Sequence, residues 1–232
     1  MTSKRTFWMI IGLSFSYMIL SFPVFFIIGD GLHIMLAWNI LLATIPYLIA
    51  FVIANKKIRN RWLIYGMILI WVLFYPNAFY VITDLIYLDQ ADFIWQSGFD
   101  HPMDYLQNME AYLKLFHIIS GALIGIALGV ISLESIRQHL LLPLMKRTQW
   151  LGVLIILFCS AVGIYIGRFF RFNSWDIWKF PEILREFFSN FSWFTVFFIV
   201  AFVVIQLLCY LLYFFIQKDK PMNKKEKNST SI

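Results

Sequence analysis

Six blocks of apolar residues, each about 20 residues long and separated by more polar segments, constrain this chain more than any other feature of its sequence. A helix of ~20 apolar residues crosses a hydrocarbon layer of ~30 Å and satisfies all of its own backbone hydrogen bonds there. We therefore predict an all-α fold, a polytopic membrane bundle of six transmembrane helices. The predicted spans are Phe7–Ile28, Leu32–Ala54, Trp62–Thr83, Ala111–Leu133, Trp150–Phe170 and Trp193–Ile216.

The composition agrees with a membrane protein and excludes two other classes. Apolar residues make up 61% of the chain and charged residues only 14%, whereas a soluble domain carries about 25% charged residues. A chain this apolar also cannot stay solvated as a disordered protein. An ordinary cytoplasmic globule and an intrinsically disordered chain are both excluded.

Lysine and arginine are unevenly distributed among the connections, and this predicts the orientation. Fourteen of the 19 basic residues lie in the N-terminal segment, the second-to-third and fourth-to-fifth connections, and the C-terminal tail. Because basic residues favour the cytoplasmic side, we predict a multi-pass protein of the cell membrane with both termini cytoplasmic. Residues 1–216 should form one domain, followed by a basic, disordered tail over 217–232. The net charge of +6 is explained by this distribution, so no nucleic-acid partner is expected.

One outer connection has the pattern of a surface helix. After Pro181, apolar residues recur at steps of three and four, and polar residues fill the opposite face. This pattern predicts an amphipathic helix over Glu182–Phe191 that lies in the outer membrane interface. The alternative is an extended start of the sixth span, but a helix over Phe187–Ile216 would be ~45 Å long.

Glycines at four-residue intervals in the fourth and fifth spans mark helix faces that point into the bundle. Small residues allow helix backbones to approach closely in lipid. His117 lies one turn before the first of these glycines on the same stripe, so its ring should also point inward. The glycines are Gly121, Gly125, Gly129, Gly163 and Gly167.

Polar side chains collect near the outer ends of several spans, at a depth where ionisable groups are costly and usually paired. Asn77, Tyr80 and Asp84 share one face at the end of the third span, and Arg168 and Arg171 share a face at the end of the fifth. The candidate ligand-binding residues are Asn77, Tyr80, Asp84, His117, Arg168, Arg171, Asn173 and Asp176.

Two arginines with an amide and a phenol are typical of a phosphate or carboxylate site, because the guanidinium fork matches those oxygens. An ion pair of Asp84 with Arg168 or Arg171 would equally tie two helices together. The sequence lacks the common hydrolase, zincin, P-loop and dinucleotide motifs. No metal-ligand spacing surrounds His117 or either cysteine, so neither a metal nor a cofactor is expected. His33, which stands alone, is expected to be an interface residue.

Two motifs resemble those of the bacterial integral membrane family catalogued as domain of unknown function 1361. In that family the third span carries a Pro-Asn-Ala-Pro-Tyr run ending in Thr-Asp. The fifth span ends in Gly-Arg-Phe followed by Arg-x-Asn-Ser-Trp-Asp. Phe79 and Tyr87 stand where the resemblance predicts proline and histidine. The resemblance implies the fold and a membrane location but no activity. The matching residues here are Pro76-Asn77-Ala78-Phe79-Tyr80 with Thr83-Asp84, and Gly167-Arg168-Phe169 with Arg171-Phe172-Asn173-Ser174-Trp175-Asp176.

Three functions remain open at this point. We expect a non-enzymatic protein that binds or moves an anionic solute, such as a lipid headgroup or lipid-linked phosphate, through an outward-facing polar pocket. The first alternative is an intramembrane enzyme acting on lipid or cell-envelope substrates, with Asp84, His117 or Asp176 as acid, base or metal ligand. The second is a structural or accessory subunit whose outer helix docks a protein partner. Membrane lipids are the expected surroundings in each case.

Overall fold

The computed structural model describes residues 4–55, 58, 60–89, 93–95 and 104–218. Within this part of the chain the fold is an all-helical bundle, as the sequence predicts. Its only strands there are β1 (Ile94–Trp95) and β2 (Asp104–Tyr105), which form one short antiparallel pair.

The helices follow the six apolar blocks closely. Five described helical segments are long and apolar enough to cross a membrane. The 62-residue segment Met109–Phe170 covers the fourth and fifth predicted spans. The chain reverses direction between them at Lys146, whose φ is +41°. The elements are α1 (Lys4–Ile28), α2 (Leu32–Asn55), α3 (Arg61–Phe74), α4 (Pro76–Tyr80), η1 (Val81–Tyr87), α5 (Met109–Ile136), η3 (Arg137–Leu141), α6 (Leu142–Met145), η4 (Lys146–Thr148), α7 (Gln149–Tyr165), η5 (Ile166–Phe170), η6 (Asp176–Lys179), α8 (Phe180–Ser189) and α9 (Trp193–Lys218).

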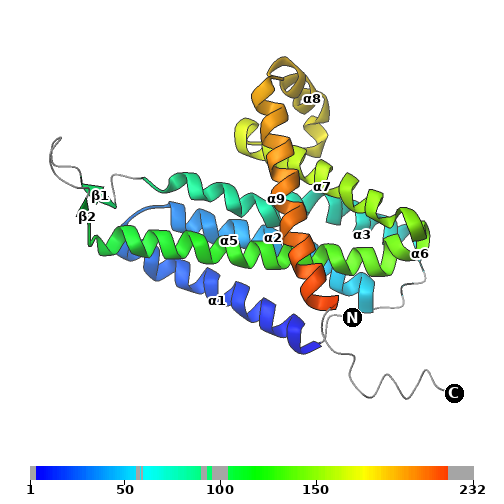
Figure 1. Ribbon diagram of the computed structural model, residues 1–232, viewed down its shortest axis with the longest axis horizontal. Helices are drawn as coiled ribbons and strands as arrows, with labels where there is room; N and C mark the ends of the chain where they lie inside the picture. The colour runs from blue at the N-terminus through cyan, green and yellow to red at the C-terminus, as the bar shows by residue number, and fades with distance from the viewer. Residues whose placement is uncertain (1–3, 56–57, 59, 90–92, 96–103, 219–232) are drawn as a thin grey trace.

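Helix α2 is central to the bundle and packs against α1, α3, α4 and α5, whereas α7 packs mainly against α9. In Figure 1, α1, α2 and α5 run side by side along the long axis, and α9 crosses them steeply. The start of α1 and the end of α9 lie toward the same end of the bundle (Figure 1).

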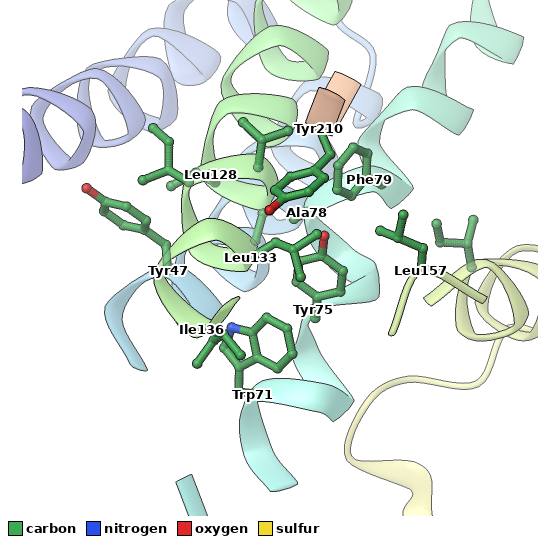
Figure 2. Packing of buried hydrophobic residues seen from close by; sticks show 14 of the residues in the cluster. Tyr47, Trp71, Tyr75, Ala78, Phe79, Leu128, Leu133, Ile136, Leu157 and Tyr210 are labelled. Atoms are coloured by element: carbon green, nitrogen blue, oxygen red, sulfur yellow. The ribbon is translucent and has the colours of Figure 1, made fainter. Parts of the chain in front are cut away.

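Large aromatic side chains fill the core where α3 and α4 meet α5 (Figure 2). Trp71 and Tyr75 stack with ring centroids 4.7 Å apart, and each is only 1% exposed. The indole Nε1 of Trp71 donates to the hydroxyl of Ser132 at 2.7 Å, and that hydroxyl donates to the carbonyl of Pro46 at 3.1 Å. This chain of bonds joins α3, α5 and α2 and satisfies the indole N–H of Trp71 and the hydroxyl of Ser132.

The glycine stripes lie where the prediction places them, at helix contacts. A Cβ added at Gly125 would overlap Val81 and the carbonyl oxygen of Ala78, and one at Gly129 would overlap the ring of Phe79. Gly121 faces Tyr17 of α1 in the same way, whereas Gly163 and Gly167 face Pro76 and Tyr80 of α4. The small residues therefore let α4 lie close to both α5 and α7, and η1 lie close to α5.

The predicted amphipathic surface helix is present as α8, which begins at Phe180, slightly earlier than expected. Phe187 is half-buried against Tyr165, with ring centroids 6.0 Å apart, while Phe188 and the polar face are exposed. Both cysteines are free, and Cys159 is exposed on α7. Of the predicted tail, only Gln217 and Lys218 lie within the described residues, where they continue α9.

Candidate functional site

Pro76 separates α3 from α4 and sets the position of Asp84. Helix α3 ends at Phe74, and α4 begins at Pro76 because proline suits a first helical turn and cannot continue a preceding one. The chain then tightens into the 3₁₀ helix η1, which carries Asp84. The carboxylate of Asp84 is fully buried, and the side-chain amide of Asn39 in α2 donates to its Oδ2 at 2.9 Å.

Arg168 reaches the same carboxylate from the opposite side. It lies in η5, the π-helical turn that ends the α7 segment. Its Nη1 donates to Oδ1 of Asp84 and to the hydroxyl of Tyr87, each at 3.4 Å. The guanidinium carbon lies 4.9 Å from the ring centroid of Tyr87 and 5.9 Å from that of Tyr80. We call these five residues, Asn39, Tyr80, Asp84, Tyr87 and Arg168, the arginine cluster.

The ion pair in the arginine cluster is long. Charge-assisted N–H···O bonds between arginine and a carboxylate are ordinarily about 2.7–2.9 Å long, compared with 3.4 Å between Arg168 and Asp84. The side chain of Arg168 is 13% exposed, whereas that of Asp84 is 0% exposed. In the described part of the chain, Asp84 is the only carboxylate paired with Arg168. Most of the guanidinium fork is therefore not committed to a carboxylate.

The other candidate residues near the end of α7 serve local structure. Asn77 donates its side-chain amide to the hydroxyl of Ser174 at 2.9 Å and to the carbonyl of Phe74 at 3.0 Å. It thus joins α4 to the loop after η5. Arg171 has a φ of +60° and is exposed, and its side chain forms no hydrogen bond or ion pair with any residue that the structure describes. Of the two expected ion pairs, the structure contains Asp84–Arg168.

Asn173 and Asp176 form a turn of their own. The backbone N–H of Asn173 donates to Oδ2 of Asp176 at 2.8 Å, and Lys179 lies 3.6 Å from Oδ1. These contacts lower the pKa of Asp176, chiefly through the backbone hydrogen bond from Asn173. The turn begins the path into η6 and α8 and is separate from the arginine cluster.

His117 points into the bundle as predicted, but it belongs to a second polar group, which we call the histidine cluster: Tyr17, Ser21, His33 and His117. His33 is 0% exposed, so the expectation that it is an interface residue is wrong. Nδ1 of His33 lies 3.0 Å from Nδ1 of His117, and Nε2 of His117 lies 3.0 Å from the hydroxyl of Ser21. Three helices, α1, α2 and α5, therefore meet through these side chains.

The bonds of the histidine cluster determine its tautomers. The hydroxyl of Ser21 donates to the carbonyl of Tyr17 at 2.9 Å, so the same oxygen must accept from Nε2–H of His117. Nδ1 of His117 then accepts from Nδ1–H of His33. The remaining nitrogen of His33, Nε2, is buried without a hydrogen-bond partner among the described residues.

A family comparison covers most of this region. The family model described as protein of unknown function (DUF1361) matches residues 38–209, well over half of the chain. The chain belongs to the DUF1361 family. The DUF1361 match contains the whole arginine cluster but only His117 of the histidine cluster. No curated protein matches the chain, and no solved structure matches it.

Sequence reasoning missed two members of the arginine cluster in this DUF1361 protein. Asn39 is an amide in the middle of an apolar span, which is a usable signal because a polar group in lipid needs a partner. Tyr87 stands where the family resemblance predicts histidine, and it supplies both a hydroxyl and a ring face to Arg168.

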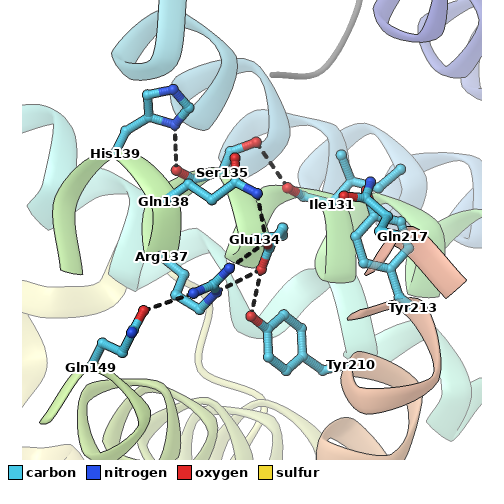
Figure 3. A network of polar contacts seen from close by, with 10 residues as sticks. All are labelled: Ile131, Glu134, Ser135, Arg137, Gln138, His139, Gln149, Tyr210, Tyr213 and Gln217. Carbon is cyan, nitrogen blue, oxygen red and sulfur yellow. Dashed lines mark hydrogen bonds and ion pairs between the residues drawn. The ribbon is translucent and has the colours of Figure 1, made fainter. Parts of the chain in front are cut away.

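Sequence reasoning also missed a buried network around Glu134 and Arg137, where α5 continues into η3 (Figure 3). Arg137 donates from Nε and Nη2 to the two carboxylate oxygens of Glu134 at 2.8 and 2.7 Å. The hydroxyl of Tyr210 donates to the same carboxylate at 2.6 Å, and Arg137 also donates to Gln149 at 2.7 Å. The apolar pattern places Arg137 in the connection between the fourth and fifth spans, whereas the structure buries it to 8% exposure. The three-residue spacing of Glu134 and Arg137 on one helix was the available signal.

Neither of two hollows on the described surface is lined by Asp84 or Arg168. One, of about 370 Å³, is largely apolar and includes Leu88 and Leu115 in its lining. The other, of about 350 Å³, lies on the polar face of α8. Within the arginine cluster only Asp84 is fully buried, whereas Asn39, Tyr80 and Arg168 are partly exposed and Tyr87 is exposed.

Proposed function

We propose that this DUF1361 protein is a multi-pass membrane protein that binds an anionic group, phosphate or carboxylate in type, at Arg168. The single observation that supports this function most strongly is the geometry of Arg168. Its side chain is 13% exposed, and its only carboxylate partner among the described residues lies 3.4 Å away. A guanidinium presents five donors in a planar fork that fits two oxygens of one anion, and the aromatic faces of Tyr80 and Tyr87 hold that fork in place.

The membrane arrangement that we propose has Arg168 near the outer surface and both termini in the cytoplasm. The distribution of basic residues supports this orientation. The positions of the start of α1 and the end of α9 agree with it, because they lie toward the same end of the bundle (Figure 1). In this orientation α8, which follows the Arg168 segment through η6, lies at the outer interface.

The chemistry of the site does not distinguish a lipid headgroup from a free solute anion, since both present the same oxygens to arginine. The test therefore uses both sources. The purified protein is placed in phosphatidylcholine nanodiscs and titrated with sulfate. In parallel, its thermal unfolding is compared between pure phosphatidylcholine discs and discs that also contain phosphatidylglycerol.

The variant that tests the proposal is R168Q, and the matched control is R185Q on the exposed polar face of α8. Charge-assisted hydrogen bonds contribute about 1.5–3 kcal/mol each, so R168Q should weaken sulfate binding about tenfold to a hundredfold. R185Q should bind like the wild type. If phosphatidylglycerol raises the unfolding temperature of the wild type but not of R168Q, and sulfate binds neither, the ligand is a lipid headgroup. Equal binding of both anions by R168Q and the wild type would contradict the proposal.

A structural role is the second candidate, and the complete burial of Asp84 favours it. In that case the arginine cluster only ties η1 to α2 and η5. R168Q would then lower the free energy of unfolding, while sulfate would bind neither the wild type nor the variant.

A further inference from the structure

Asp84 and Arg168 are an incomplete pair, and their bonds show which partner holds each of them. The shorter bond to Asp84 comes from the neutral amide of Asn39, at 2.9 Å, and not from Arg168, at 3.4 Å. Asp84 is thus anchored mainly to α2, whereas Arg168 is held largely by aromatic ring faces. The carboxylate of Asp84 accepts one long bond from the guanidinium and does not form the two parallel bonds that an arginine fork allows.

An external anion at Arg168 would have to share this guanidinium with Asp84. Two negative charges around one buried cation repel each other, and a buried carboxylate without its cation is costly. One of the two negative charges must therefore leave or be neutralised. Asp84 cannot leave, because η1 fixes its backbone between α2 and α5.

The groups that face Asp84 offer no second cation. Asn39 from α2 is neutral, and Tyr17 from α1 and Tyr87 from η1 are phenols. Within the part of the chain that the structure describes, Arg168 from η5 is the only cation in contact with Asp84. A proton is therefore the simplest charge that can replace the guanidinium.

Asn39 suits both states of the carboxyl group. Its Nδ2 donates to the ionised carboxylate in the structure, and a rotation of the amide by half a turn would present its oxygen to a carboxylic O–H. An ionised aspartate or glutamate at this position could not donate to the ionised form of Asp84. The amide therefore keeps Asp84 paired whether or not it carries a proton.

We infer that Asp84 is the resident counter-anion of Arg168, and that an external anion binding to Arg168 is accompanied by uptake of one proton at Asp84. The inference rests on the proposed function and adds a second ligand, the proton, to the same site. One proton from the aqueous side bonds to a carboxylate oxygen of Asp84 and offsets one negative charge of the entering anion: the whole charge of a monovalent anion, or one of the two charges of sulfate. No other bond forms or breaks.

The experiment measures sulfate affinity in phosphatidylcholine nanodiscs from about pH 5 to about pH 9, a range in which sulfate does not change its own charge. With one coupled proton, the wild-type affinity should fall by up to about tenfold per pH unit as the pH rises above the range in which Asp84 is protonated. In D84N the affinity should be independent of pH and at least as high as the wild-type value at acidic pH. E186Q, on the exposed face of α8, should keep the wild-type pH dependence.

A direct count of protons separates this inference from the proposed function. In weakly buffered solution with a pH indicator, sulfate should cause uptake of one proton per bound anion by the wild type and by D84E, which retains a carboxyl group, and none by D84N. Binding that requires Arg168 but takes up no proton would overturn the inference and leave the proposed function intact. Weaker binding by folded D84N at every pH would also overturn it, whereas no sulfate binding by the wild type would remove both.

Discussion

Two arginine–carboxylate pairs of the bundle differ in how completely they are bonded. Arg137 forms a two-bond fork on Glu134 at 2.7 and 2.8 Å, and the carboxylate also accepts from Tyr210 at 2.6 Å. Arg168 approaches Asp84 through one nitrogen at 3.4 Å. Both carboxylates are buried, so the difference lies in geometry and not in exposure.

The comparison shows that the same two kinds of side chain are bonded to different degrees in one molecule. A saturated pair ties helices together, because breaking it leaves an uncompensated buried charge. In the Glu134 network the ties run from α5 to α7 and α9. An unsaturated pair can exchange its partner at lower cost, which is what a binding site requires. The completeness of bonding therefore distinguishes the anchor from the candidate site.

The largest effect that tests this comparison is expected from E134A. Removing one partner of a buried ion pair costs about 3–5 kcal/mol, because Arg137 stays buried without its carboxylate. D84A should cost less, about 1–3 kcal/mol, because Arg168 is partly accessible and weakly bonded. Free energies of unfolding in detergent measure both, with E186A on exposed α8 as a control that should change little. Equal losses for E134A and D84A would remove the distinction between the two pairs.

A smaller effect is expected when the phenol hydroxyls beside the two pairs are removed. Y210F deletes a 2.6 Å bond to a buried carboxylate and should cost about 1.5–3 kcal/mol. Y87F deletes only a 3.4 Å bond to Arg168 and leaves the ring in place, so it should cost less than about 0.5 kcal/mol. The same unfolding measurements apply. A loss in Y87F as large as that in Y210F would show that the arginine cluster is as tightly bonded as the Glu134 network.

The smallest effect is expected at the turn that contains Asp176. It tests whether the pH dependence of this turn comes from Asp176 alone. The backbone N–H of Asn173 lowers the pKa of Asp176 below its ordinary value. A carboxyl group with a depressed pKa stabilises its turn above the ordinary value of about 4 and loses this contribution as the pH falls through the lower, folded-state value. Protection of the Asn173 amide from hydrogen exchange should therefore decrease only in acid, and D176N should abolish that dependence. A pH dependence that persists in D176N would show that another group controls this turn.

Much of the fold could be predicted because hydropathy acts locally. Each apolar block must satisfy its own backbone in lipid, so the helix bounds follow from the sequence within a few residues. The stripe that begins at Gly121 could be assigned to helix contacts because four-residue spacing defines one face of a helix. Asp84 and Arg168 were likewise predicted as one of two possible ion pairs, since each charge in an apolar span needs a partner.

The remaining parts of the site could not be predicted, because they depend on which helix faces meet. Asn39 and His33 are isolated polar residues in α2, and no neighbouring residue in the sequence indicates that Asp84 and His117 are their partners. Arg137 looks like a connection residue until α7 and α9 pack over it. These contacts join segments that are far apart in the sequence.

Taken alone, the sequence determined that this chain forms apolar helices of membrane length, where their closely packed faces lie, and which few polar groups need partners inside them. Only the tertiary structure decided that Glu134 is fully bonded and Asp84 is not, and that Asn39 rather than Arg168 holds Asp84 most closely. The physical reason is the range of the forces involved. Hydropathy and backbone bonding act within one helix, whereas the strength of an ion pair depends on differences of less than 1 Å between atoms that separate helices bring together.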